Sequence, residues 1–555
     1  MFQKLKSIKK SILFIPGFIG GILLFLVGHQ PNDDAYISFR HSRNFAEYGE
    51  LVWNVKDTEK VLGTSSPLFS FLLGCFGVLF GSQNIPILSL YFNIFILVLN
   101  SSFVFKISHQ FTNSTLISFF ITLLISVNSY SIRTLSQGFE FGLFTFLMFA
   151  NVYLLLNANT NYKKNIALIL PNLLLLTRIE GIFIYPLAFV MLYIWHREKK
   201  IKNYQILLPF LFLFYLIFSY YYYNGFLPQS IHSKKFYKEF FPVFPLSDDF
   251  FENIRQRLYV VYQFLYTALF PILRYGTEQI TFELEKYPYK SGNFFLNSNS
   301  SLLNFSFLLT FVVLYNLYKK KKLLEIYYFA YIPFFLAFVF YTIRIEFWYL
   351  VPVISVYLLF LSIGGYLLID LVLNFLSNFF RVINNNKIYI RNFIMIFFLF
   401  LWFDKNFYMI NKNILPFDSY RGILYPPGSR DKVEWERYFA YKETIDFLNK
   451  NHIKGEIATF EVGVLGFFYD DNLLDLFGLC SRKVIQHYFE NLNGLKEDNT
   501  VYVLKKEKPA LFISGMNLNQ ESPLKSYLET NYRIIFYSKF TVFGDTLYVW
   551  RRKDL

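Results

Sequence analysis

The sequence predicts a polytopic α-helical membrane protein with a soluble α/β domain at its C-terminal end. Three observations lead to this prediction. Of the 555 residues, 54% are hydrophobic, and many form runs long enough to cross a bilayer. Short basic loops separate these runs. After about residue 411 the chain becomes more highly charged, and its apolar stretches become short.

Hydrophobic runs occur at about 11–28, 67–80, 86–105, 114–129, 140–157, 165–177, 181–195, 205–224, 303–318, 324–342, 348–370 and 393–410. The run 67–80 is short, is interrupted by glycine, and has no basic loop on its far side. It therefore predicts a juxtamembrane helix that lies along the interface. The remaining runs predict about eleven transmembrane helices.

The distribution of basic residues predicts the orientation. With eleven spans, the basic clusters at 4–10, 106, 163–164, 196–202, 319–322 and 381–391 all face the cytoplasm, as the positive-inside rule requires. The N-terminus is then cytoplasmic, and the loop 29–85 lies on the opposite side. We expect a transmembrane domain at 1–410, in the inner or plasma membrane, and an extracytoplasmic domain at 411–555.

The C-terminal region alternates between strand-like and helix-like segments. The apolar stretches GEIATF, NLLDLFGL, PALFISG, YRIIFYSKF and DTLYVWRR are typical of short strands, and 435–450 has an amphipathic helical pattern. This alternation predicts a small α/β domain.

The net charge of +15 lies mainly in loops beside apolar runs. The positive-inside rule explains that distribution better than nucleic-acid binding does, so we expect the bilayer, and no nucleic acid, as a partner. The two cysteines, Cys75 and Cys480, are far apart and lack metal-ligand spacing, so they predict neither a disulfide framework nor a zinc site.

Two adjacent aspartates, Asp33 and Asp34, open the segment DDAYISFRHSRNFAEYGELVWN just after the first apolar run. Helical spacing places Asp33, Arg40 and Asn44 along one side. A carboxylate beside a guanidinium suits proton abstraction from a hydroxyl next to a bound phosphate. The alternative is helix capping by Asn32 or Asp33, with the carboxylates favoured by the helix dipole.

This loop, followed by GTSSPLF, resembles the first extracytoplasmic loop of GT-C polyprenyl-phosphate-sugar glycosyltransferases, and most of all the cell-wall arabinofuranosyltransferase branch. SQGFE, LLTRIEG, FLPQSIHSKK and ATFEVGVLGFFYDDNLLDLFGL are similar to further segments of that family, in the same order. The chain departs from the family pattern at Glu50, Ile179 and Gln229, which bears on the identity of the sugar.

The resemblance implies transfer of a sugar, arabinofuranose or another pentose or hexose, from a polyprenyl-phosphate donor to a cell-envelope glycan. It implies that Asp33 or Asp34 is the catalytic base. The residues expected to bind the donor phosphate are Arg40, Arg178, Lys234, Lys235 and Arg344. The residues expected to contact the sugar or acceptor are Tyr36, Asn44, Glu140, Glu180, His232, Trp348 and Tyr349.

Several of these residues have a plainer interpretation. Arg178 and Glu180 can simply form an ion pair, and Glu140 can be a helix N-terminal carboxylate. Trp348 and Tyr349 fit an interfacial aromatic belt, and Lys234 and Lys235 fit a solvated surface.

The cofactor requirement stays open. Paired carboxylates such as Asp33 with Asp34, or Asp248 with Asp249, suit a divalent cation, but we assign no metal ligands. GVLG at 463–466 lacks the spacing of a nucleotide-binding loop.

A transporter or flippase of lipid-linked saccharides is the alternative function, and an assembly subunit without an active site is a third. A transporter is expected to carry its charges near mid-bilayer. Here the candidate charges lie at the ends of spans on one side, together with the soluble region, which favours an enzyme.

Overall fold

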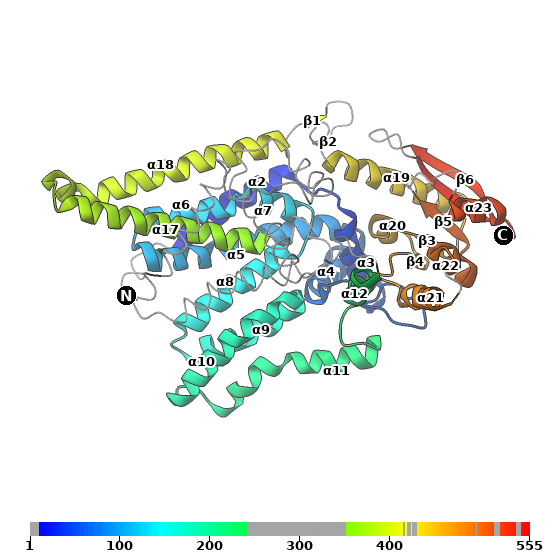
Figure 1. The fold of residues 1–555 in the computed structure, drawn as a ribbon, viewed down its shortest axis with the longest axis horizontal. Helices are drawn as coiled ribbons and strands as arrows, with labels where there is room; N and C mark the ends of the chain where they lie inside the picture. The colour runs from blue at the N-terminus through cyan, green and yellow to red at the C-terminus, as the bar shows by residue number, and fades with distance from the viewer. Residues whose placement is uncertain are drawn as a thin grey trace.

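The computed structural model describes residues 10–240, 312, 315, 351–413, 417–418, 423–424, 430–494, 497–514, 522–539 and 546–555. Its N-terminal part is a bundle of helices aligned along the long axis of the molecule, and its C-terminal part is a separate layered domain at one end of that bundle (Figure 1). The predicted spans at 303–318 and 324–342 lie almost entirely outside the described residues.

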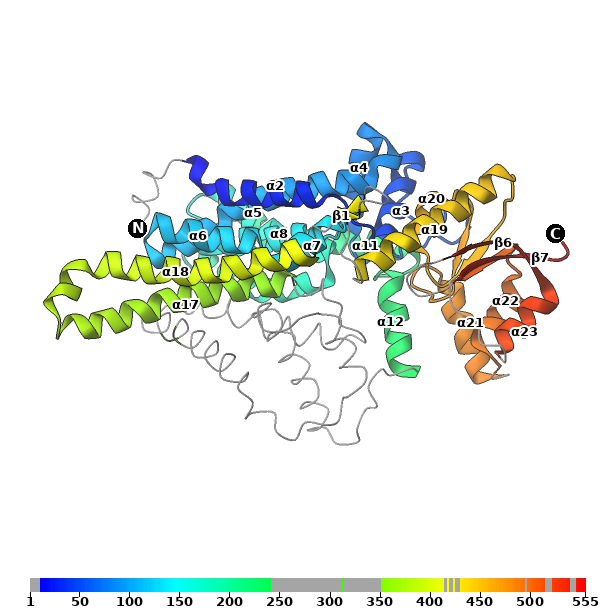
Figure 2. The ribbon, with the colours of Figure 1, turned by 90° about the horizontal axis from the view of Figure 1, so that it is seen from above.

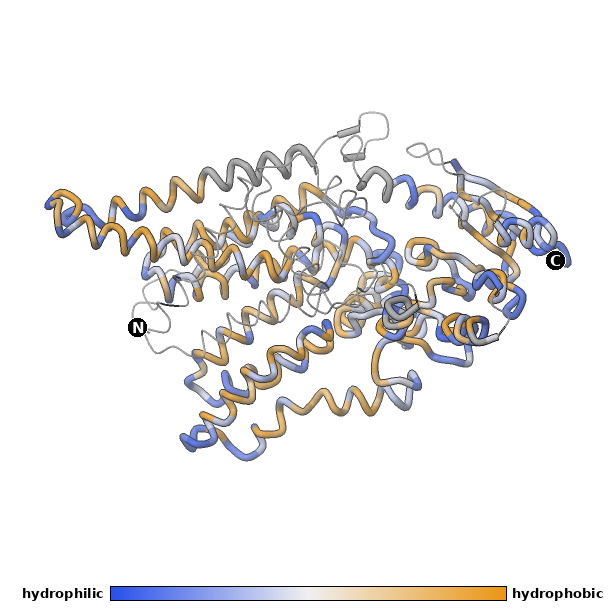
Figure 3. The backbone as a smooth tube through the Cα atoms, viewed as in Figure 1, coloured by the Kyte–Doolittle hydropathy of each residue, from blue (hydrophilic) through white to orange (hydrophobic). Residues whose placement is uncertain are grey.

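The bundle is built from apolar helices that pack against one another (Figure 1). These are α2 (Ile15–Val27), α5 (Ile85–Thr112), α6 (Thr115–Ser126), α8 (Phe141–Asn157), α9 (Asn161–Thr177), α10 (Tyr185–Arg197), α11 (Phe212–Tyr223), α17 (Val351–Ser377) and α18 (Arg381–Asn413). Figure 3 shows that hydrophobic residues dominate most of these helices, whereas the C-terminal domain is mixed.

In the described part of the chain, three helical segments are long and apolar enough to cross a membrane, namely Ser82–Thr112, Ile179–Arg197 and Val351–Ser377. The pair Asn203–Phe210 and Phe212–Tyr223, bent by 40°, adds a fourth if it counts as one span. The short helices η1 (Lys10–Leu13), η2 (Ser82–Asn84), η3 (Ile179–Ile184) and η4 (Asn203–Phe210) precede α2, α5, α10 and α11.

Four shorter helices lie at the end of the bundle that faces the C-terminal domain: α3 (Asp33–Tyr48), α4 (Pro67–Phe80), α7 (Ser129–Ser136) and α12 (Gln229–Phe240). The helix α4 covers the segment predicted to be juxtamembrane, and it packs closely on α3. Gly74 permits this packing, because a Cβ atom there would lie 2.7 Å from the Phe45 ring.

The C-terminal domain contains a five-stranded sheet in the order β4-β3-β5-β7-β6. The strand β3 (Ile457–Thr459) runs parallel to β4 (Leu473–Asp475) and β5 (Leu511–Ser514). The strand β7 (Thr546–Arg552) is antiparallel to β5 and to β6 (Tyr532–Lys539). A separate two-stranded pair, β1 (Phe417–Asp418) with β2 (Ile423–Leu424), precedes the domain.

Helices cover both faces of this sheet. The helices α19 (Arg430–Lys450) and α20 (Gly463–Phe468) pack on one face, and the other is covered by α21 (Arg482–Asn493), α22 (Asn499–Glu507) and α23 (Pro523–Asn531). Successive residues of β3 therefore enter different cores: Ile457 faces α19 and α20, whereas Ala458 faces α21 to α23. The core on the α20 side continues into the membrane bundle through Tyr36, Phe39 and Trp53.

Candidate functional site

The DD motif lies in the first turn of α3. Asn32 has extended backbone angles, and its side chain accepts a hydrogen bond from the Asp34 amide at 3.1 Å. Asn32 is thus the N-cap, and the two carboxylates sit where the helix dipole favours them. Gly49 ends the helix in a left-handed conformation with φ of 75°.

Asp33 reaches across to the C-terminal domain. Its carboxylate accepts hydrogen bonds from the backbone amides of Gly463, at 3.0 Å, and Val464, at 2.8 Å. The side chain is half-buried, and burial followed by the charge of Glu461 raises its pKa to about 8, although the two amides oppose this shift. Asp34, in contrast, is exposed.

A second carboxylate approaches Asp33 from the C-terminal domain. Glu461 lies two residues before Gly463, and its Oε2 accepts a hydrogen bond of 2.6 Å from the buried Tyr441 hydroxyl. Its Oε1 pairs with Arg437 of α19 at 3.2 Å. The junction therefore gathers acidic groups from segments more than 400 positions apart in the chain.

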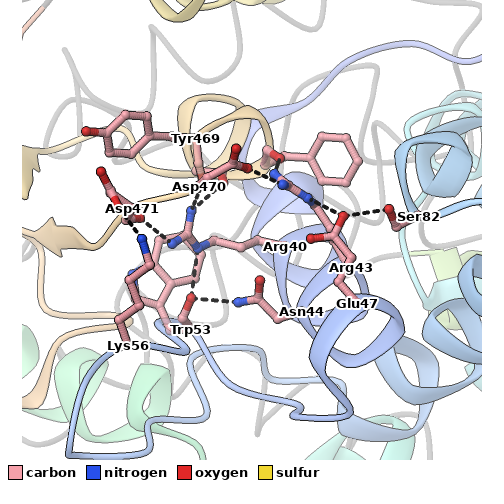
Figure 4. Close-up of polar contacts among 12 residues, drawn as sticks. Arg40, Arg43, Asn44, Glu47, Trp53, Lys56, Ser82, Tyr469, Asp470 and Asp471 are labelled. Atoms are coloured by element: carbon pink, nitrogen blue, oxygen red, sulfur yellow. Dashed lines mark hydrogen bonds and ion pairs between the residues drawn. The ribbon is translucent and has the colours of Figure 1, made fainter. Parts of the chain in front are cut away.

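The Arg40 guanidinium is occupied by protein groups, and its predicted role as a phosphate ligand stays a prediction. It is 4% exposed, and its guanidinium donates to the carbonyl oxygens of Gly466, Trp53 (2.8 Å), Tyr469 (2.9 Å) and Asp471 (3.0 Å) (Figure 4). It also donates to the Asn54 side chain at 3.1 Å. Burial followed by the neighbouring Arg43 lowers its pKa to about 10. Arg40 joins α3 to the carbonyl end of α20.

Tyr36 and Asn44 also make structural contacts, and their predicted roles as sugar contacts stay predictions. Tyr36 is 1% exposed and packs edge-on against Phe467, with ring centroids 5.5 Å apart. The Asn44 side chain donates to the carbonyl oxygens of Val52 and Trp53, each at 2.9 Å, and so fixes the loop after α3.

The loop after α3 closes the edge of the sheet. The Asn54 side chain accepts from the Leu473 amide at 3.1 Å and donates to the Leu473 carbonyl oxygen at 3.0 Å. Asn54 thus takes the place of a neighbouring strand beside β4, and ion pairs of Lys56 with Asp471 and of Glu59 with Arg482 flank it. Sequence reasoning missed this role of Asn54, because no local pattern shows that its side chain meets β4.

The LPQS segment, residues 227–230, also contacts the C-terminal domain and the loop after α3. The backbone amide of Gln229 donates to the Leu62 carbonyl oxygen at 2.8 Å. The side chains of Gln229 and Ser233 both donate to the Gly478 carbonyl oxygen. Farther along α12, Lys234 is half-buried and His232 is exposed. The side chain of Lys235 lies outside the described residues.

Arg178, Glu140 and Glu180 form a buried ion cluster. Arg178 pairs with Glu140 and, at 2.8 Å, with Glu180, and all three residues are at most 6% exposed. The Arg178 guanidinium carbon also lies 4.5 Å from the centre of the Phe141 ring. The structure thus matches the ion-pair interpretation of Arg178 and Glu180 and extends it to Glu140.

The remaining candidates, Arg344, Trp348, Tyr349, Asp248 and Asp249, lie outside the described residues. Within the described ranges, no three His, Cys, Asp or Glu side chains are grouped so that they could hold a metal ion. Sequence reasoning also missed Glu461, Gly463 and Tyr441, because no local pattern shows that they meet α3.

Comparison with known proteins supports the fold. A family model described as a domain of unknown function (DUF8728) matches residues 431–551, and no curated protein matches the chain. The apo oligosaccharyltransferase of Archaeoglobus fulgidus is similar, with a TM-score of 0.50 and 14% identity over 98% of this chain and 74% of that chain. ArnT from Cupriavidus metallidurans bound to undecaprenyl phosphate has a TM-score of 0.49 and 10% identity over 97% and 96%. At 14% identity the likeness to the archaeal oligosaccharyltransferase concerns the fold alone.

Proposed function

We propose that the protein is a membrane glycosyltransferase that moves a sugar from a polyprenyl-phosphate donor to a glycan acceptor of the cell envelope. The observation that carries this proposal is the position of Asp33 and Asp34. They lie at the junction between the apolar helices and the C-terminal α/β domain (Figure 2), and the likeness in fold to an oligosaccharyltransferase supports a GT-C transferase. A lipid-linked donor and a water-soluble acceptor can meet at such a junction.

The chemistry requires a base for the acceptor hydroxyl. One carboxylate of the DD pair takes the hydroxyl proton as the oxygen attacks the anomeric carbon, and the lipid phosphate leaves with the electron pair of the broken bond. The raised pKa of Asp33, about 8, brings this carboxyl close to the range in which a general base works best.

The donor phosphate needs cationic partners near this pair. Arg40 is used by the domain junction, and Arg178 is held in its ion cluster. Lys234, Lys235 and Arg344 stay as candidates for this role, and a divalent cation is a further candidate. The arabinofuranosyltransferase branch, and with it a pentofuranose donor, remains a prediction from the sequence motifs.

The distribution of basic loops supports the extracytoplasmic location of the reaction. It predicts that α3 and the C-terminal domain lie outside the cytoplasm, where the proposed glycan acceptor would be found. The described helices show the membrane character of the chain, and its orientation is part of the proposal.

The test is to incubate the purified protein with a panel of polyprenyl-phosphate sugars and octyl glycoside acceptors and to follow release of the free lipid phosphate. Release that depends on the acceptor supports the proposal. Movement of intact lipid-linked sugar between the leaflets of a vesicle, without release of lipid phosphate, would instead identify a flippase.

A further inference from the structure

The helix α20 is held along its whole length by α3. Asp33 binds the amides of Gly463 and Val464, at the start of α20, whereas Arg40 and Arg43 bind the carbonyl oxygens of Gly466, Phe467 and Tyr469, at its end. These are the backbone groups that lack partners within a short helix, and the charges have the signs that each end favours. Residue numbers rise together along the two segments, so α3 and α20 run in the same direction.

The contact is close enough to require glycine. A Cβ atom on Gly463 would overlap the carbonyl oxygen of Asp33. A Cβ atom on Gly466 would lie 2.9 Å from the Trp53 ring and 3.2 Å from Cδ of Arg40. The backbone of α20 is therefore pressed directly against α3, and no other residue type fits these two positions without a shift.

The rest of the C-terminal domain supports α20 from the opposite side. Leu465 and Phe467 are fully buried, and they belong to the same core as Tyr441, Ile457 and Leu511. Arg43 also pairs with Asp470, two residues past the end of α20 (Figure 4). Because the sheet holds α20 and α20 holds Asp33, the orientation of this carboxylate is set by the domain as a whole.

We propose that the C-terminal domain, whose residues 431–551 match a domain of unknown function, positions the catalytic carboxylate of Asp33, and that Gly463 is the positioning residue through which it acts. This inference rests on the proposed transferase function. Each carboxylate oxygen accepts one amide hydrogen bond and has a second lone pair. The amides thus fix the plane of the carboxylate while a lone pair can still meet the acceptor hydroxyl, and fixed geometry of this kind contributes strongly to rate.

The decisive variant is Gly463→Ala, which removes no polar group and leaves Asp33 and Asp34 in the chain. We expect kcat to fall by roughly 10²-fold, the effect of misplacing a catalytic group by about 1 Å, while KM for the donor stays within about twofold. Gly365→Ala in α17 is the matched control, since a Cβ atom there meets nothing within 4 Å. An unchanged kcat for Gly463→Ala, or a rise in donor KM alone, would overturn the proposal.

A second measurement does not depend on turnover. Hydrogen exchange of the peptide that contains Gly463 and Val464 is compared between Asp33→Ala and Asp34→Ala in detergent. We expect exchange at these amides to quicken by at least about tenfold in Asp33→Ala only, because only Asp33 accepts their hydrogen bonds.

The two measurements separate the two proposals. If exchange responds as expected but no donor releases lipid phosphate, the contact stands and the transferase function fails. Equal exchange in both variants would refute the contact itself. Should Gly463→Ala fail to fold, Arg43→Gln loosens the far end of α20 and is expected to lower kcat in the same way, again without a change in donor KM.

Discussion

Asp33 and Gly463 are in direct contact although 430 positions separate them: the carboxylate accepts the Gly463 amide hydrogen at 3.0 Å, and the Asp33 carbonyl oxygen occupies the space of a Cβ atom. The first residue of the DD motif is therefore both a candidate base and a contact between domains. Substitutions at Asp33 should therefore affect both activity and the contact with α20, whereas substitutions at Asp34 should affect activity alone.

The two aspartates are expected to respond differently. Asp33→Asn should lower kcat by roughly 10²–10⁴-fold, since it removes a general base. It should also weaken the contact with α20, because the asparagine NH₂ group is a donor and cannot accept a hydrogen bond from the second backbone N–H. Asp34→Asn is expected to lower activity without changing protection of the Val464 amide. The control is Asp446→Asn, an exposed position on α19. Full activity in both motif variants would exclude the DD pair from catalysis.

The pH dependence follows from the raised pKa of Asp33. Because a base works in its charged form, kcat/KM is expected to rise with pH through about 8. The folded protein holds a proton that the unfolded chain has already lost above pH 4, so the free energy of unfolding should decrease as pH rises from about 4 to about 8. The charged groups facing Asp33 are Asp34 and Glu461, the latter with Arg437. A profile that stays flat from pH 6 to 9 would contradict this assignment.

Arg40→Met tests whether Arg40 acts as a contact between domains or as a phosphate ligand. The substitution leaves several buried carbonyl oxygens without their donor, and each unsatisfied oxygen costs about 1–3 kcal/mol in the free energy of unfolding. Thermal unfolding and proteolysis of the C-terminal domain measure this loss. Lys56→Met is a suitable comparison at the same interface, because Lys56 is 61% exposed and its pair with Asp471 is worth less than about 1 kcal/mol. If Arg40→Met were stable and only donor KM rose, a phosphate ligand would be the better description.

Arg40 shows which features the sequence could predict and which it could not. Helical spacing correctly placed Asp33, Arg40 and Asn44 on one side of a helix capped by Asn32, because spacing and capping are local properties. It could not show what covers that side. The partners of Arg40 are carbonyl oxygens at Gly466 and Tyr469, and any residue type can supply a carbonyl oxygen.

The strands show the same limit. The stretches IAT, LLD, LFIS, YRIIFYSK and TLYVWRR do form strands, since alternation and apolar character are visible along the chain. The sheet order and the closure of its β4 edge by Asn54 depend on contacts between distant segments. No local pattern in the sequence shows which distant segments make these contacts.

The buried cluster around Arg178 gives a further prediction. Arg178→Met leaves Glu140 and Glu180 buried without their shared cation, so the variant is expected to lose about 3–5 kcal/mol in stability or to fail to accumulate. Glu180→Gln should be milder, because Arg178 keeps Glu140 as a partner. Glu198→Gln removes one member of an exposed pair with Lys200 and should leave the melting temperature unchanged. A stable Arg178→Met variant with impaired donor use would argue for a phosphate ligand instead.

The orientation in the membrane can be tested at the two ends of the bundle. The turn between α17 and α18 lies at the end of the molecule opposite to the C-terminal domain (Figures 1 and 2). Near that turn, Asp370 pairs with Arg391 at 2.6 Å and with Lys387 at 3.5 Å, and the basic residues of this segment predict a cytoplasmic location. The bundle separates the α17–α18 turn from the C-terminal domain.

A reporter inserted at residue 379 and one fused after Leu555 are therefore expected to report opposite sides of the membrane. We expect the first to be active in the cytoplasm and the second outside it. Opposite sides with the reverse assignment would put Asp33 and Asp34 in the cytoplasm, where nucleotide-activated sugars would replace the lipid-linked donor as the natural substrate.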